Sequence, residues 1–239
     1  MYPIAGYSAR MSARLLAGSG VLLIALAAPA AAQAAPTIQP LKPCYVTAGT
    51  ATEPQAEGFD LRAAGFTPNS EVELQVDDAV RDGGEALKVD GSGVLTLTDP
   101  VPAPFVATGM RDFTVKLTEL GNRANVATAT AKTTALDVTL KPPEAPPWRR
   151  IRFKGLGFTK HKPIWAHYVH KGKLRKTVRM ARRPGECGGF TARRRQIPIK
   201  RPGLGRWIVQ FDQSKRFVDP ELRPIVFVRV EIRLRLVPR

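Results

Sequence analysis

The sequence predicts an all-β protein of two tandem β-sandwiches that follow an N-terminal export signal. Three observations support this fold class. Segments of the first half of the chain recur in the second half. Apolar and polar residues alternate with period two through both halves, as they do in half-buried strands. Turn residues separate the alternating segments, and no convincing amphipathic helix follows the leader.

The internal repeat relates two segments of domain size. Three pairs of segments correspond: Gly65-Phe66-Thr67 with Gly157-Phe158-Thr159, residues 93–102 with 189–198, and residues 112–118 with 206–212. Their offsets of 92, 96 and 94 residues agree to within a short insertion each. A solenoid unit would be only about 20–50 residues long, so each copy is a whole domain.

Residues 1–34 have the pattern of a secretory signal peptide. A basic stretch precedes an apolar run over 15–28, and small residues at 32 and 34 suit signal peptidase, so cleavage is expected after Ala34. Translation from Met1 and translation from Met11 both fit this pattern. The apolar run is short for a membrane span, and no hydrophobic tail closes the chain. We therefore expect a secreted protein with no transmembrane anchor.

The first domain is expected over residues 35–140, with about seven short strands. The alternating segments are 44–47, 59–63, 72–76, 87–89, 94–97, 113–117 and 126–140. Thr67-Pro68-Asn69-Ser70 is turn chemistry, and Asp90-Gly91-Ser92-Gly93 is a hairpin signal. This number of short strands with turns between them is typical of an immunoglobulin-like sandwich.

The second domain is expected over residues 148–239 and repeats the scheme. Its alternating segments are 151–154, 164–169, 174–180, 190–197, 207–211 and 228–236. The last of these places Val228, Val230, Ile232, Leu234 and Leu236 on one face. Between the domains, the proline-rich residues 141–147 predict a short, stiff linker.

The two Gly-Phe-Thr turns carry a resemblance to a known group of domains. Gly65-Phe66-Thr67-Pro68 resembles the turn between early strands of IPT/TIG-like and other bacterial immunoglobulin-like domains. The second turn departs from that pattern, because Lys160 stands at the place of the proline. Ala166-His167-Tyr168-Val169 and Gly205-Arg206-Trp207 make the second domain similar to a module of secreted bacterial proteins. The resemblance implies surface display, adhesion or scaffolding, and it carries no catalytic residue over.

Charge is divided unevenly between the expected domains. Residues 35–146 hold nine basic and fifteen acidic residues, a net of −6. Residues 147–239 hold 26 basic and five acidic residues, a net of +21. The second domain should therefore attract polyanions. Outside a cell these are anionic cell-wall polymers or a lipid surface. Nucleic acid is disfavoured, because the chain is exported and lacks an aromatic stacking platform.

The basic residues form the leading candidate site, for which the arginine fork suits phosphate and carboxylate. The predicted polyanion-binding residues are Arg149, Arg150, Arg182, Arg183, Arg193, Arg194, Arg195, Arg229, Arg233 and Arg235. Two structural explanations compete: charge on edge strands prevents aggregation, and the acidic domain docks on the basic one. A charge of −6 leaves most of +21 uncompensated. Trp148, Trp165 and Trp207 are expected in the linker and the core.

Two rival functions stay open. One is a purely structural surface protein without a specific ligand. The other is an enzyme in which Cys187 is the nucleophile and His167 and Asp212 complete a triad. The alignment of Cys187 with the hairpin at 90–93 disfavours the enzyme and indicates a structural turn. The sequence therefore predicts no catalytic residue and leaves the oligomeric state open.

No metal site and no cofactor are expected. His167 and His170 lie three apart on a strand and point to opposite faces, so they do not chelate one ion. We expect one of them to be half-buried and the other solvated. Asp77, Asp78 and Asp82 cluster beside two glycines, but their spacing is not that of a calcium loop, so a solvated loop is the expectation.

Whether the two cysteines pair is left open by the sequence. Cys44 and Cys187 lie one in each domain, and export permits a disulfide. The usual strand order of a sandwich places Cys44 at the pole of the first domain that is remote from the linker. A disulfide needs Cα atoms within about 7 Å, so it would require the domains to fold back on each other.

Overall fold

The computed structural model describes residues 35–81, 86–220 and 226–235. Within these ranges the chain is built from strands and a single 3-10 turn, η2 (Glu186–Gly188), so the all-β prediction is confirmed. No helix of this part of the chain has the length and hydropathy of a membrane span. The predicted signal peptide, Asp82 and Leu236 lie outside the described residues.

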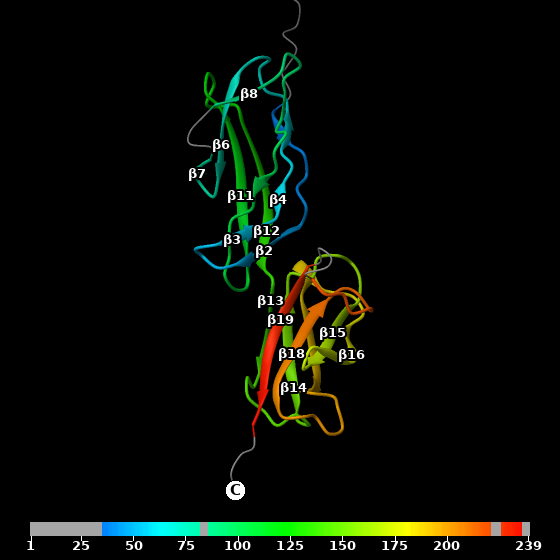
Figure 1. Ribbon diagram of the computed structural model, residues 1–239. Coiled ribbons are helices and arrows are strands. Elements are labelled where there is room, and N and C mark those ends of the chain that lie inside the picture. Colours follow the sequence, from blue (N-terminus) through cyan, green and yellow to red (C-terminus); the bar gives the residue numbers. More distant parts are fainter. Residues whose placement is uncertain (1–34, 82–85, 221–225, 236–239) are drawn as a thin grey trace, which may run out of the picture. The chain divides into compact units, whose positions relative to one another are not determined.

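The first sandwich pairs a large sheet with two small ones (Figure 1). The large sheet has the order β3-β2-β12-β11-β6-β7, and β8 also pairs with β6; the small sheets are β1-β5-β9 and β10-β4. The bounds of the strands are β1 Thr37–Ile38, β2 Cys44–Gly49, β3 Pro54–Ala56, β4 Gly58–Phe59, β5 Arg62–Ala64, β6 Glu71–Val76, β7 Ala79–Val80, β8 Leu87–Lys88, β9 Val94–Thr96, β10 Val101–Pro102, β11 Met110–Glu119 and β12 Val126–Ala135.

The core of the first sandwich follows from the alternation of its long strands. Phe113, Val115 and Leu117 of β11 are buried, while the residues between them are exposed or half-buried. The Phe113 ring packs against Tyr45 and Phe59, with ring centroids 6.0 and 5.8 Å away. Edge-on and tilted ring pairs at this separation add to the stabilisation from burial.

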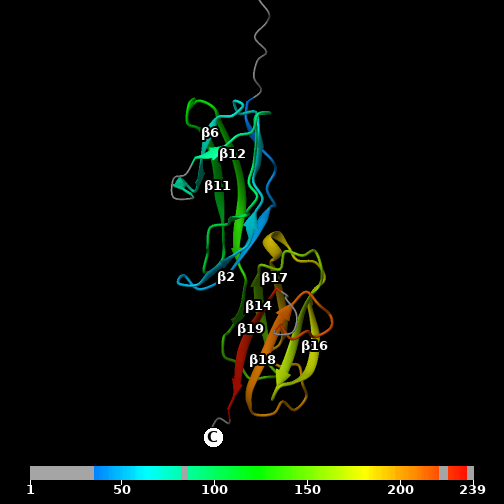
Figure 2. The ribbon, with the colours of Figure 1, turned by 45° about the horizontal axis from the view of Figure 1, so that its top comes forward.

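The second sandwich has two sheets. One has the order β13-β14-β17 and the other β16-β15-β18-β19. Figure 2 shows β14 and β17 side by side, as their antiparallel pairing requires. The bounds are β13 Asp137–Lys141, β14 Arg150–Leu156, β15 Ile164–His170, β16 Lys173–Ala181, β17 Phe190–Arg195, β18 Gly205–Asp212 and β19 Phe227–Leu234.

The core of the second sandwich is aromatic. Trp207, Tyr168, Phe153 and Phe211 are buried between the two sheets, and the rings of Phe153 and Phe211 lie 5.9 Å apart. The predicted apolar face of β19 contacts this core through Ile232, which is buried, and through the half-buried Val228, Val230 and Leu234. Each sandwich therefore has its own core.

The domain boundary expected at residue 140 is wrong. The segment 126–140, expected to be one strand of the first domain, is two strands that belong to different sandwiches. β12 ends at Ala135, and β13 pairs along its length with β14, so that Asp137 faces Leu156 and Lys141 faces Arg152. Val138 is buried in the second core. The alternation continues across the change of sheet, so the sequence carries no break there.

The proline-rich segment is therefore a connection within the second sandwich. Residues 142–147 join β13 to β14, and their assignment as an interdomain linker is wrong. Divided at Leu136, the chain carries a net charge of −5 over 35–136 and +20 over 137–239. The corrected boundary leaves the charge asymmetry in place.

The two Gly-Phe-Thr turns adopt the same conformation in the two sandwiches. Gly65 and Gly157 have φ of +94° and +84°, and the phenylalanine that follows each is buried. The backbone N–H groups of Gly65 and Phe66 donate to the Gly93 carbonyl oxygen. In the second copy, those of Gly157 and Phe158 donate to the Cys187 and Gly188 carbonyl oxygens. The predicted correspondence between the 90–93 hairpin and the Cys187 turn is therefore a structural one.

The two cysteines are bonded in the structure, with their Cα atoms 5.4 Å apart. The expectation that Cys44 lies remote from the second domain is wrong. β2 pairs in parallel with the last strand of the first sandwich, so Cys44 lies opposite Lys132 and close to the point where the chain enters β13. Lys132 forms an ion pair with Glu186, the neighbour of Cys187, at 2.6 Å.

Candidate functional site

Cationic side chains cover the outer face of the β13-β14-β17 sheet. On β14, Ile151 and Phe153 point into the core, so Arg150, Arg152 and Lys154 are exposed on the opposite face. On β17, Ala192 is buried, while Arg193 and Arg195 are exposed. Lys141 is exposed at the end of β13. We call this set the basic face: Lys141, Arg150, Arg152, Lys154, Arg193 and Arg195.

The register of the sheet brings these cations into rows across the strands. Lys141 faces Arg152, and Arg152 in turn faces Arg193. Arg150 faces Arg195 in the next row. Neighbouring strands lie about 4.8 Å apart and residues on one face of a strand repeat about every 7 Å, so the charges are closely spaced. Lys141, Arg150, Arg152 and Arg193 also line a surface hollow of about 420 Å³.

The basic face is not neutralised by acidic side chains of the described residues. None of its six cations forms an ion pair with a carboxylate in this part of the chain. The Arg150 guanidinium donates a hydrogen bond to the Arg193 carbonyl oxygen at 3.2 Å, a neutral partner. Like charges directly opposite each other destabilise a sheet. A bound anion would relieve this repulsion.

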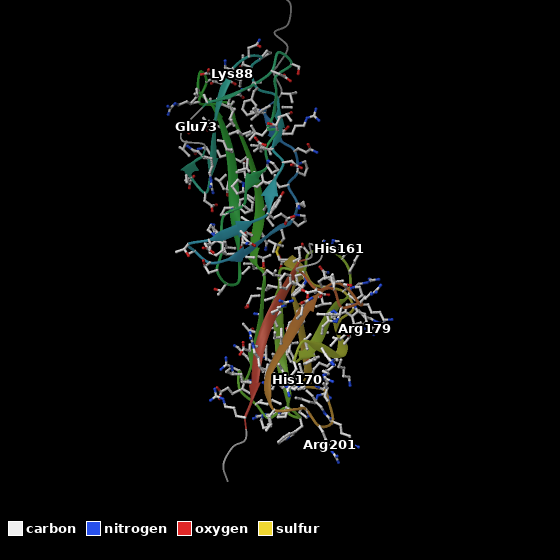
Figure 3. All side chains as sticks on the ribbon, viewed as in Figure 1. Glu73, Lys88, His161, His170, Arg179 and Arg201 are labelled. Atoms are coloured by element: carbon white, nitrogen blue, oxygen red, sulfur yellow. A yellow bond between two sulfur atoms is a disulfide. The ribbon has the colours of Figure 1, made fainter. Side chains whose placement is uncertain are left out.

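The ten arginines predicted from the sequence do not form one site. Arg150, Arg193 and Arg195 meet on the basic face. Arg194 lies between two of them but is half-buried, and its guanidinium donates to the Arg193 carbonyl oxygen at 3.0 Å. Four others are exposed away from the rows of the face: Arg149, Arg182, Arg183 and Arg235. Figure 3 shows Arg179 and Arg201 pointing outward from the second sandwich as well, so basic residues surround it.

The arginines of β19 have acidic partners. Arg229 pairs with Asp219 at 3.4 Å, and Arg233 pairs with Glu231 at 2.7 Å. Arg206 of the neighbouring strand also contacts Glu231, at 2.8 Å. The hydrogen bond from Arg233, aided by Arg206, holds the pKa of Glu231 below its ordinary value. This edge of the second sheet is therefore less available to an external anion.

Three residues of the basic face were missed by the sequence analysis. Lys141 had been placed in the linker, and Arg152 and Lys154 were read only as the polar positions of a strand. The alternation from Arg150 to Lys154 was a usable signal, because every second residue of a half-buried strand shares a face. The position of Lys141 depends on pairing between β13 and β14, which no local pattern shows.

The predicted triad does not exist. Cys187 is bonded to Cys44, so it has no thiol to act as a nucleophile. His167 and Asp212 do meet, with Nε2 3.3 Å from Oδ1. His167 Nε2 also lies 3.0 Å from the Ser214 carbonyl oxygen, so this nitrogen carries a proton and donates. The Asp212 carboxylate accepts from the Gln210 side-chain amide at 2.9 Å and from the Ser214 backbone N–H at 2.8 Å.

This polar cluster is buried and holds a loop against the sheet. His167, Gln210 and Asp212 are fully buried, although they lie on the face of the sheet that points away from the core. The Phe217 ring packs 5.6 Å from the His167 ring, and the Val218 carbonyl oxygen accepts from the Gln210 amide. All polar atoms of the cluster have protein partners, so we assign it a structural role.

The expectation for the two histidines was right about direction and wrong about burial. They point to opposite faces, as their spacing predicted. Both are buried, because each face is covered. His170 stacks on Trp207 with ring centroids 4.4 Å apart, and its Nε2 lies 3.1 Å from the Leu204 carbonyl oxygen. No group of three or more metal-ligating side chains is found within the described ranges.

The acidic turn after β6 is tied to the first sandwich. Asp77 and Asp78 have φ of +52° and +62°, which a tight turn between β6 and β7 requires. The Asp77 carboxylate accepts hydrogen bonds from the Thr114 backbone N–H at 3.0 Å and from the Arg111 guanidinium at 2.5 Å. Its oxygens are thus engaged within the chain.

Comparison with known proteins leaves the function to be argued from the basic face. No protein-family model matches the chain, and no curated protein matches it. A tetra-tandem repeat from the extending region of a large adhesion protein is 13% identical, with a TM-score of 0.29 over 80% of this chain and 49% of that one. Bovine butyrophilin is 11% identical, with a TM-score of 0.29 over 84% of this chain and 98% of that one. The N-terminal eight Ig domains of Down Syndrome Cell Adhesion Molecule are 12% identical, with a TM-score of 0.27 over 84% of this chain and 27% of that one. The chain thus spans about half of the adhesion-protein repeat.

Proposed function

We propose that the protein is a secreted, non-enzymatic binding protein whose second sandwich attaches to anionic polymers of a cell envelope through the basic face. The observation that carries the proposal is the pair of cationic rows on β13, β14 and β17. Five cations stand opposite one another there without a carboxylate partner among the described residues. Such an arrangement costs stability in the free protein and favours a bound anion.

The compartment is supported by two features of the chain. Residues 1–34 have the pattern of a secretory signal. The disulfide between Cys44 and Cys187 suits an oxidising environment outside the cytosol. Outside a cell, phosphate- and carboxylate-bearing polymers are the nearest polyanions, and the arginine fork matches both groups.

Substitution of the basic face tests the proposal. In the face variant, Lys141, Arg152 and Arg193 are replaced by Gln. In the matched control variant, Lys173, Arg175 and Arg179 of β16 are replaced by Gln, which removes the same charge from exposed positions on the other sheet. Affinity for long-chain inorganic polyphosphate is measured by titration at low salt. The face variant should bind on the order of 100-fold more weakly, since each cation near a charged surface contributes about 1 kcal/mol.

The control variant separates a site from a general charge effect. It should keep most of the native affinity for polyphosphate. Equal losses in the two variants would mean that binding follows net charge and that the basic face is not a site.

A second candidate function is a structural surface protein without a specific ligand. The observation that favours it is the basic character of the edge strands: β16 carries Lys173, Arg175, Lys176 and Arg179, and β19 carries Arg229 and Arg233. Charged side chains on an edge strand prevent strand-to-strand aggregation without any ligand. Absence of saturable binding by the native protein to polyphosphate and to isolated cell wall would favour this function.

A further inference from the structure

Trp148 is an exposed aromatic residue in an unusual position. Its exposed fraction is 71%, the highest among the large apolar side chains of the described residues. The other two tryptophans are different: Trp207 is buried in the core, and Trp165 is half-buried. A tryptophan that is left in water forgoes the burial of about 150–250 Å² of side-chain surface. The linker role expected from the sequence does not explain it, because residues 142–147 are not a linker.

The backbone around Trp148 is held firmly. The Arg149 N–H donates to the Pro146 carbonyl oxygen, and the Arg149 carbonyl oxygen accepts from the Gln196 N–H, each at 2.9 Å. The Ile197 N–H donates to the Pro147 carbonyl oxygen at the same distance. The two prolines also restrict the backbone that leads into the turn. The ring is therefore displayed from a fixed support.

This support adjoins the basic face. Trp148 stands two residues before Arg150 and four before Arg152, and such positions share a face when a strand is extended back along its register. The hydrogen bonds to Gln196 and Ile197 continue the β14–β17 pairing beyond its last pair, Arg150 with Arg195. The order along the sheet is thus an aromatic ring, then two arginines, then the row of Lys141, Arg152 and Arg193.

The combination selects a class of polyanion. Guanidinium groups bind carboxylate, sulfate or phosphate through paired hydrogen bonds. An indole ring offers an apolar face with an electron-rich π-system, which suits the C–H face of a sugar ring. A simple polyphosphate has only the charges. A lipid surface favours a broad apolar face, whereas the exposed side chains on β13, β14 and β17 are lysine, arginine and threonine.

We propose that Trp148 and the basic face together bind an acidic polysaccharide, with a sugar ring stacked on the indole and acidic groups held by the arginines. This inference rests on the proposed function, because it names the polymer that the basic face takes. Trp148 supplies the preference for a carbohydrate, and the arginines supply most of the affinity.

The test compares ligands of similar charge with and without sugar rings. Polygalacturonate and inorganic polyphosphate of matched charge number are titrated against the native protein, Trp148→Ala and Trp148→Phe. Trp148→Ala should weaken polygalacturonate binding on the order of tenfold, the effect of one lost aromatic stacking contact. Polyphosphate binding should not change. Trp148→Phe keeps an aromatic face and should retain most of the affinity for polygalacturonate.

The outcomes separate this inference from the proposed function. If Trp148→Ala binds polygalacturonate as tightly as the native protein does, the carbohydrate inference is overturned and the polyanion function stands. If the native protein binds neither polymer, the proposed function itself fails. Vesicles that contain an anionic phospholipid form a third arm. Tighter native binding to the vesicles than to polygalacturonate, lost in Trp148→Ala, would overturn the carbohydrate in favour of a lipid surface.

Discussion

Single residues at the repeated turns explain why the two sandwiches share a sequence signature. Gly93 and Gly188 occupy equivalent places, with φ of +79° and +74°. A Cβ at either position would overlap the backbone of the phenylalanine in the adjacent Gly-Phe-Thr turn, Phe66 or Phe158. Glycine is needed there for its backbone angle and for the space it leaves. The signature therefore reports on packing of the turns, which is why it predicts the fold and not the ligand.

This role of Gly188 is testable with a matched glycine. Gly172 has a similar φ of +71°, but a Cβ there would meet nothing within 4 Å. Gly172→Ala should cost about 1 kcal/mol of unfolding free energy through the backbone angle alone. Gly188→Ala should cost at least about 2 kcal/mol, because the neighbouring backbone must also move. Urea denaturation measures both values, and equal losses would show that the close approach to Phe158 does not matter.

A buried carboxylate links one turn of the first sandwich to pH. Burial raises the pKa of Glu119, but hydrogen bonds from the Asn125 side-chain amide and the Thr67 N–H outweigh it, so the pKa lies below its ordinary value. A lowered pKa stabilises the fold above the pKa of the unfolded chain, and this stabilisation is lost as pH falls through the folded pKa. Glu119→Gln should therefore be less stable than the native protein at neutral pH.

The pH dependence of that difference is the measurement. Unfolding free energies of the native protein and Glu119→Gln should converge as the solution is acidified through the ordinary range of a glutamate. A difference that stays constant with pH would contradict the role assigned to the charged form of Glu119.

At the scale of elements, most of the strands and half of the basic face could be predicted from the sequence. Period-two alternation identified β6, β11, β15, β18 and β19, because each of these strands has one face in a core. The change of sheet at Leu136 was missed, because alternation is equally satisfied by either sandwich. Arg150, Arg193 and Arg195 were predicted from their charge, while the contribution of Lys141 depended on a pairing partner 11 residues away, Arg152.

The disulfide is the other connection that local patterns did not show. It joins β2 to η2 across 143 residues of sequence, so it removes many conformations from the unfolded chain. Replacement of both Cys44 and Cys187 by Ala should lower the unfolding free energy by about 2–5 kcal/mol. Thermal unfolding with and without reductant checks this. Reductant should lower the Tm of the native protein to that of the double variant and leave the variant unchanged; a native Tm that ignores reductant would contradict the bond.

At the scale of the whole molecule, the uneven charge is what points to function. The segment 137–239 carries a net charge of +20, against −5 for 35–136, so the acidic part cannot neutralise the basic part. Charge of this size steers a polyanion toward the protein over long distances. The structure adds a place where that charge is dense and unpaired within the described residues. Net charge brings the polymer near, and the rows on β13, β14 and β17 hold it.

The most direct test of this account is the salt dependence of polyphosphate binding by the native protein, the face variant and the β16 control variant. The logarithm of the association constant should fall linearly with the logarithm of salt concentration, with a slope set by the number of cations in contact with the polymer. The face variant should have a slope smaller by about 2–3, and the control variant should keep the native slope. Identical slopes for the two variants would contradict the assignment of the basic face as the binding surface.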